Sequence, residues 1–180
     1  MIKSILLIIY NIIRIFFLKC FHGRRIQIHW VQRISPLCSL KIFDIGRLQI
    51  GRNTEFAPYC DFQVHGNGVL TIGDGVYLNR YCMISAHNRV SIGDGCFFGP
   101  GVKIFDNNHK YSKEDGASTD ISTSPIVIGD HCWIASDVII LKGSRIGNNC
   151  VIGAGCIIHG EIPDGMLVKS LQTLDISPIK

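Results

Sequence analysis

A histidine in the longest polar interruption of this 180-residue chain is its best candidate for chemistry. His109 lies near the start of the stretch 105–125, which is rich in Asp, Asn, Ser and Thr and has no hydrophobic period. A neutral imidazole, with an ordinary pKa of about 6.5, can remove a proton from a hydroxyl near pH 7. Such a base needs a hydrogen-bond acceptor on its second ring nitrogen, and Asp106 or a main-chain carbonyl could supply it. A lone loop histidine is more often a solvated surface residue, so the candidate depends on the elements that position it.

The sequence on both sides of this interruption repeats every six residues. Large aliphatic or Phe residues recur at Ile50, Phe56 and Phe62, at Ile72, Leu78, Ile84 and Val90, at Ile92, Phe98 and Ile104, and then at Ile128, Ile134, Ile140, Ile146, Ile152 and Ile158. The next position is often Gly. This period fits a three-sided coil in which each rung turns one large side chain inward, and stacked coils about 4.8 Å apart bury those side chains together. We therefore predict a mainly β solenoid, a parallel β-helix, over residues 45–163, with 105–125 as an extruded loop and 164–180 as a C-terminal tail.

Six of the eight cysteines share one place in these hexads, four positions after the large residue. They are Cys60, Cys82, Cys96, Cys132, Cys150 and Cys156. That place is the small inward position, where free Cys acts as a compact hydrophobe. No Cys-x-x-Cys pair or zinc-type spacing occurs in the sequence. We expect buried free thiols and no metal, with a disulfide or metal site as the alternative.

Residues 1–44 differ from the rest of the chain. Residues 1–52 hold nine Lys and Arg against one acid, although the whole chain is only 18% charged and 47% hydrophobic, which excludes a disordered protein. Thirteen of the seventeen residues 2–18 are large and apolar, and the exceptions fall on one side of a helix. We predict a helix whose contact with an anionic membrane surface involves residues 1–25, with packing on protein or a transmembrane span as alternatives. No signal-peptide cleavage pattern follows it, so we expect a retained segment in the reducing cytosol.

The hexads and the spacing around the loop histidine resemble those of the hexapeptide-repeat acyltransferases, especially the galactoside and maltose O-acetyltransferases and enzymes of surface-polysaccharide synthesis. In that family an Asn precedes the loop histidine by thirty positions and a Trp follows it by twenty-four, as Asn79 and Trp133 do around His109. The segments 128–135 and 151–158 resemble the later coils of the family. The resemblance implies a left-handed β-helix, a homotrimer, and no nucleic-acid partner.

The same resemblance implies roles for individual residues. His109 would be the general base. Asn79, His87 and Trp133 would contact the acceptor, and Ser136 and Ala154 would contact acetyl-CoA. The implied reaction moves an acetyl group to a sugar hydroxyl in cell-surface polysaccharide synthesis, in the bacterial cytoplasm or at the inner face of the membrane.

Two segments depart from the family pattern, and other functions stay open. Residues 166–175 replace a Gly-x-Pro-Ala-type turn, and His159-Gly160 stands where relatives carry Thr-Lys near the pantetheine. These departures favour a non-enzymatic β-helix that acts as a scaffold or binding module. Transfer to an amino group would use the same site residues. Outward histidines at 65, 87 and 131 also suggest a metal-dependent carbonic anhydrase of the same fold, but its ligand spacing is not found.

Overall fold

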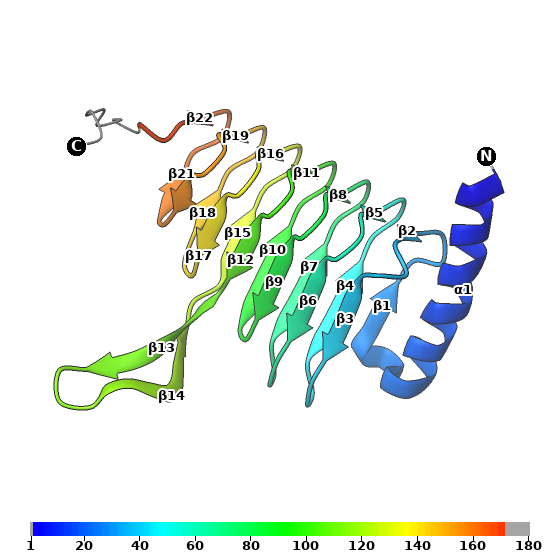
Figure 1. The fold of residues 1–180 in the computed structure, drawn as a ribbon, viewed down its shortest axis with the longest axis horizontal. Coiled ribbons are helices and arrows are strands. Elements are labelled where there is room, and N and C mark those ends of the chain that lie inside the picture. The colour runs from blue at the N-terminus through cyan, green and yellow to red at the C-terminus, as the bar shows by residue number, and fades with distance from the viewer. Residues whose placement is uncertain (1, 172–180) are drawn as a thin grey trace, which may run out of the picture.

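The chain forms a three-sided parallel β-helix preceded by one α-helix in the computed structural model, which describes residues 2–171 (Figure 1). The helix α1 (Ile2–His22) and the short 3₁₀ helix η1 (Gly23–Arg25) come first, and the coils then stack in chain order away from them. The prediction of a mainly β solenoid is therefore confirmed. Of the predicted tail 164–180, residues 172–180 lie outside the described part of the chain.

Three parallel sheets form the walls of the solenoid. Each of the first six coils adds one strand to every wall, and the last described coil adds strands to sheets A and B only. Sheet A contains β1 (Ile26–Ile28), β4 (Arg47–Ile50), β7 (Val69–Ile72), β10 (Arg89–Ile92), β15 (Ile126–Ile128), β18 (Arg145–Ile146) and β21 (Glu161–Ile162). Sheet B contains β2 (Arg33–Ile34), β5 (Glu55–Phe56), β8 (Tyr77–Leu78), β11 (Phe97–Phe98), β16 (Trp133–Ile134), β19 (Val151–Ile152) and β22 (Leu167–Val168). Sheet C contains β3 (Ser39–Ile42), β6 (Asp61–Val64), β9 (Met83–Ala86), β12 (Lys103–Phe105), β17 (Ile139–Leu141) and β20 (Ile157–Ile158).

The hexad residues fill the interior of the prism. Every large residue of the predicted register is at most 5% exposed. Equivalent residues of successive coils pair directly, as Ile50 does with Ile72 and Ile92 with Ile128. Each such side chain contributes about 1.5–3 kcal/mol on full burial, which requires the neighbouring coils. All eight cysteines are free thiols, and the six in the hexads are buried as predicted.

A ladder of carboxylates explains why Gly follows the large residue at one of the three corners. At the corner between sheets A and B, Asp94 Oδ1 accepts the backbone N–H of Asp74 at 2.7 Å, and Asp130 Oδ1 accepts that of Asp94 at 2.8 Å. A Cβ placed on Gly73 would lie 2.3 Å from Asp94 Oδ1 and 2.7 Å from the backbone of Gly93. A side chain at position 73 is therefore sterically incompatible with the ladder.

The β-helix begins earlier than the predicted boundary at residue 45, because residues 26–42 already form a first coil. Ile28 pairs with Ile50, Ile34 with Phe56, and Leu40 with Phe62. These three residues are also six apart, but none of them is followed by Gly, so the coil does not stand out in the sequence. The predicted helical segment 1–44 is thus helical only up to Arg25 among its described residues.

The predicted loop 105–125 is an antiparallel β-hairpin that projects from the stack (Figure 1). Its strands are β13 (Asn107–Ser112) and β14 (Gly116–Thr123). Residues 108–120 are all exposed. Both faces of this hairpin are exposed to solvent, so its strands need no alternation of apolar and polar residues. The sequence pattern therefore indicated only a loop.

Candidate functional site

His109 lies on β13 with its ring fixed by the opposite strand. Its Nδ1 is 2.9 Å from the carbonyl oxygen of Ser118 on β14. Because a carbonyl oxygen can only accept, Nδ1 carries the proton and Nε2 of the neutral ring keeps a free lone pair. The partner is a main-chain carbonyl, one of the two acceptors that the sequence suggested. The hairpin therefore presents an imidazole in the tautomer that suits a base acting through Nε2.

Asp106 has a different role from the one suggested beside His109. It is fully buried, and its carboxylate accepts the backbone N–H groups of His87 at 2.8 Å and Asn88 at 2.7 Å. Asn107 Nδ2 donates to the same carboxylate at 3.3 Å. These bonds fasten the corner that follows β9 to the base of the hairpin, so Asp106 positions both segments. The sequence contained no signal for this clamp.

His87 lies at that corner, beside the hairpin. Its ring stacks on His65 with centroids 4.4 Å apart, and His65 stacks on Phe43 at 4.6 Å. Burial and the neighbouring charge of His65 lower the pKa of His87; Asp106 opposes this, while the charge of His109 adds to the lowering. This lowering favours the neutral form of His87, and the side chain lies close enough to His109 for their charges to interact.

A polar cleft of about 370 Å³ opens between this corner and the base of β14. It is lined by Asn67, Val69, His87, Asn88, Arg89 and Thr123. Asn88 Nδ2 donates to Thr123 Oγ1 at 3.2 Å across it. Amide, guanidinium, imidazole and hydroxyl groups together supply the donors and acceptors that a polyhydroxylated ligand needs. Apart from His87, no residue of this cleft was identified from the sequence.

The other predicted site residues lie on sheet B or at the corner between sheets B and C. Asn79 follows β8 and is half-buried, and its Oδ1 accepts the backbone N–H of Arg80 at 2.8 Å. Trp133 begins β16 and is 55% exposed. Ser136 and Ala154 occupy equivalent positions one coil apart, where the N–H of the residue after Ala154 donates to the Ser136 carbonyl at 2.9 Å.

Within a single chain, these residues do not lie beside His109. Asn79 precedes the sheet C strand β9, whereas His109 follows the sheet C strand β12 and leaves the sheet from its opposite end. A four-residue strand such as β9 extends about 13 Å. The structure therefore groups His109 with His87 at one corner and Asn79 with Ser136 and Ala154 at another. Within residues 2–171, no group of three or more His, Cys, Asp or Glu side chains is arranged to hold a metal ion.

Comparison with known proteins identifies the repeat. Residues 125–160 match the family described as bacterial transferase hexapeptide, six repeats. The galactoside O-acetyltransferase of Escherichia coli K12 is 35% identical over 82 residues, which cover 46% of this chain and 40% of the relative. The resemblance to the hexapeptide-repeat acyltransferases is confirmed. A second relative is the putative lipopolysaccharide biosynthesis O-acetyl transferase WbbJ of the same organism, 29% identical over 97 residues.

These hexapeptide-repeat relatives are matched over only part of their length. The WbbJ match covers 49% of this chain and 50% of the relative, so the chain spans half or less of both enzymes. Among solved structures, a variant of AntD, an N-acyltransferase from Bacillus cereus in complex with dTDP and coenzyme A, has a TM-score of 0.69. That match covers 84% of this chain and 82% of AntD at 18% identity, and it shows a shared fold.

Proposed function

We propose that this chain is an acetyl-CoA-dependent O-acetyltransferase acting on a sugar hydroxyl in cell-surface polysaccharide synthesis, with His109 as the general base. The observation that carries the proposal is the 2.9 Å contact between His109 Nδ1 and the Ser118 carbonyl. This contact leaves Nε2 free to accept a proton. The two O-acetyltransferase relatives support the reaction class, and the name of WbbJ supports the acceptor class.

In the proposed reaction His109 Nε2 removes the proton of the sugar hydroxyl while the hydroxyl oxygen bonds to the thioester carbonyl carbon. The carbon–sulfur bond then breaks, and coenzyme A leaves as a thiol after taking the proton from the imidazolium. The Ser118 carbonyl stabilises the imidazolium through Nδ1–H at each turnover. The polar cleft beside His87 is the proposed place for the acceptor sugar.

The proposed active site is built from two subunits of a homotrimer. In support, His109 projects on a hairpin from one corner of the prism, whereas Asn79, Trp133, Ser136 and Ala154 lie along sheet B and the corner between sheets B and C. The small side chains of Ser136 and Ala154 leave the backbone of that corner open to a thin pantetheine arm. In a closed three-fold assembly, each hairpin would reach the sheet B side of its neighbour.

Labelled acetyl-CoA and a panel of sugars with their matched amino sugars test this function on the purified full-length chain. We expect label on a sugar hydroxyl as an alkali-labile ester. Label found only as an alkali-stable amide on amino sugars would instead establish N-acyl transfer, the activity named for AntD. Calorimetry with coenzyme A completes the test, because absence of both binding and transfer would leave a non-enzymatic scaffold.

A further inference from the structure

The amphipathic helix α1 turns its polar side chains toward the β-helix. Asn11 is fully buried, and its Nδ2 donates to the carbonyls of Leu7 and Ile34, both at 2.9 Å. Arg14 donates to the carbonyls of Ser35 at 3.3 Å and Cys38 at 2.7 Å. Ile15, which is 1% exposed, and Leu18 pack on the core from the same side of the helix. The side of α1 that faces the β-helix is therefore partly polar and not a purely apolar stripe.

The open end of the solenoid explains why polar side chains of α1 face the β-helix. Between coils, some backbone N–H groups donate to the following coil, as Ser35 N–H does to Phe56 O at 2.9 Å, and others donate to the preceding coil, as Gly75 N–H does to Arg52 O at 2.7 Å. Carbonyls of the first coil that point away from the second coil have no preceding coil to donate to them, and unpaired edge groups are costly when covered. Asn11 and Arg14 supply donors to these carbonyls, so α1 is attached to the first coil through polar contacts as well as through Ile15.

The opposite face of α1 is consequently apolar and open. It includes Leu6, Ile9, Ile13, Phe16, Phe17 and Phe21, which are between 48% and 80% exposed. All exposed positions between residues 5 and 21 are apolar except Tyr10 and Cys20, and none is charged. Soluble monomers rarely leave so large a continuous apolar surface in water.

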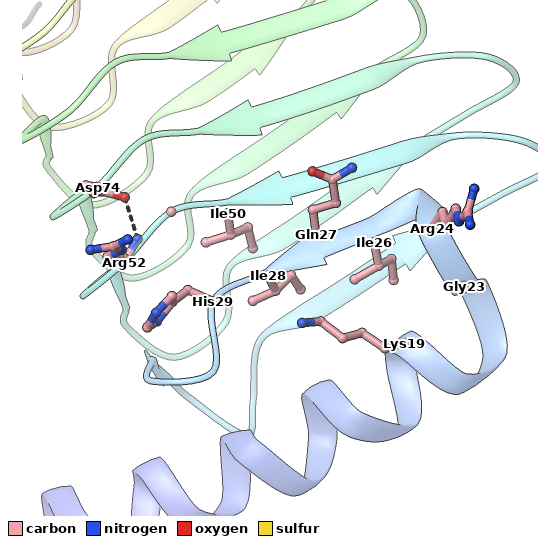
Figure 2. A pocket seen from close by; sticks show the side chains of 11 residues that line it. Lys19, Gly23, Arg24, Ile26, Gln27, Ile28, His29, Ile50, Arg52 and Asp74 are labelled. Atoms are coloured by element: carbon pink, nitrogen blue, oxygen red, sulfur yellow. Dashed lines mark hydrogen bonds between the residues drawn. The ribbon is translucent and has the colours of Figure 1, made fainter.

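A basic cleft lies between the end of α1 and the edge strands of sheet A (Figure 2). It measures about 640 Å³, and Lys19, Arg24, His29 and Arg52 line it, with Asp74 as its one acid. Figure 2 shows the Lys19 side chain reaching from the helix toward β1. Lys19 Nζ also lies 4.1 Å from the ring centroid of Trp30, a half-exposed aromatic of the kind enriched at the headgroup level of membranes.

We propose that the apolar face of α1 docks in the plane of an anionic lipid bilayer, with Lys19 and Arg24 at the phosphate headgroups. Charge complementarity favours an anionic bilayer as the partner of this face, because residues 1–52 hold nine Lys and Arg against one acid. The end of the β-helix nearest α1 would then face the membrane. The proposal does not depend on the transferase activity, since it concerns a different end of the molecule (Figure 1).

The contacts of α1 favour an in-plane position over a span. Residues 5–25 are long and apolar enough to cross a bilayer. Crossing would remove Asn11 from Ile34 and Arg14 from Cys38, and would place both polar side chains in hydrocarbon. A helix docked in the membrane plane keeps these hydrogen bonds and places only its exposed apolar face in lipid.

Co-sedimentation of the full-length chain with phosphatidylcholine vesicles, with and without phosphatidylglycerol, tests this docking. We expect binding to the anionic vesicles that weakens at high salt and falls about tenfold or more in an Ile13→Glu/Phe17→Glu variant. Arg24→Gln should weaken binding to anionic vesicles only. Leu171→Glu, which makes the same apolar-to-acid change at a 98% exposed position far from α1, should bind like the wild type.

Four results would overturn the proposal. The first is wild-type protein that stays in the supernatant with all vesicles. The second is an Ile13→Glu/Phe17→Glu variant that binds as well as the wild type while its circular dichroism spectrum shows a native fold. The third is loss of oligomer in that variant without any vesicle binding by the wild type, which would assign the face to a second copy of the chain. Resistance of bound protein to alkaline carbonate extraction would show a span and would equally exclude in-plane docking.

Discussion

The Asp106 carboxylate accepts the backbone N–H of His87 at 2.8 Å and so joins the hairpin base to the corner of the preceding coil. Asp106→Ala would leave this N–H and that of Asn88 without an acceptor, which we expect to cost about 2–4 kcal/mol of unfolding free energy. Activity should fall as well, because the hairpin carries His109. Urea denaturation measures the stability. Asp120→Ala on exposed β14 is the control, and equal stability of the two variants would contradict the clamp.

The lowered pKa of His87 makes stability depend on pH. Because the folded-state pKa lies below the unfolded one, the unfolded chain binds more protons, and stability rises with pH. The loss should begin as the pH falls through about 6.5, the ordinary histidine value, and continue to the folded-state pKa. His87→Gln removes this titration, so its unfolding free energy should change less than that of the wild type between pH 7.5 and pH 5. If the unfolding free energies of the two proteins changed equally with pH, His87 would not be the source of the pH dependence.

The carboxylate ladder predicts that Gly73 tolerates no side chain. Gly73→Ala would press a Cβ against Asp94 and the backbone of the next coil, and we expect a loss of about 3 kcal/mol or more. Gly116→Ala is the matched control, because its Cβ would meet open space and only the φ of +69° is unfavourable, at about 1 kcal/mol. Thermal unfolding followed by circular dichroism compares them. A Gly73→Ala protein as stable as Gly116→Ala would show that the ladder is dispensable.

Sequence periodicity predicted the interior of the β-helix well, because each inward residue repeats a local requirement for burial. It missed the first coil, because none of the large residues of that coil is followed by Gly, whereas each of the next five coils has at least one such Gly. It recognised α1 as amphipathic but not which face meets protein, because that depends on unpaired carbonyls at the edge of a coil. The family resemblance also placed Asn79 and His109 in one site without showing that they lie at opposite ends of sheet C.

A shared active site predicts complementation between subunits. His109→Ala and Asn79→Ala chains should each be impaired alone, since each lacks one member of every site. Chains of the two kinds that are unfolded, mixed equally and reassembled should recover about one quarter of wild-type activity, if each site in a three-fold ring takes one residue from each neighbour. Activity of the mixture no higher than the average of the two separate variants would place the whole site in one chain.

The turnover of a His109→Ala variant tests the central claim most directly. Once an acceptor is identified, kcat should fall by about 10²–10⁴-fold, because the proton of the hydroxyl would have no positioned base. His131→Asn replaces another exposed histidine by a residue that tolerates its φ of +56°, and should keep wild-type turnover. A folded His109→Ala enzyme with turnover within a few-fold of the wild type would contradict the mechanism.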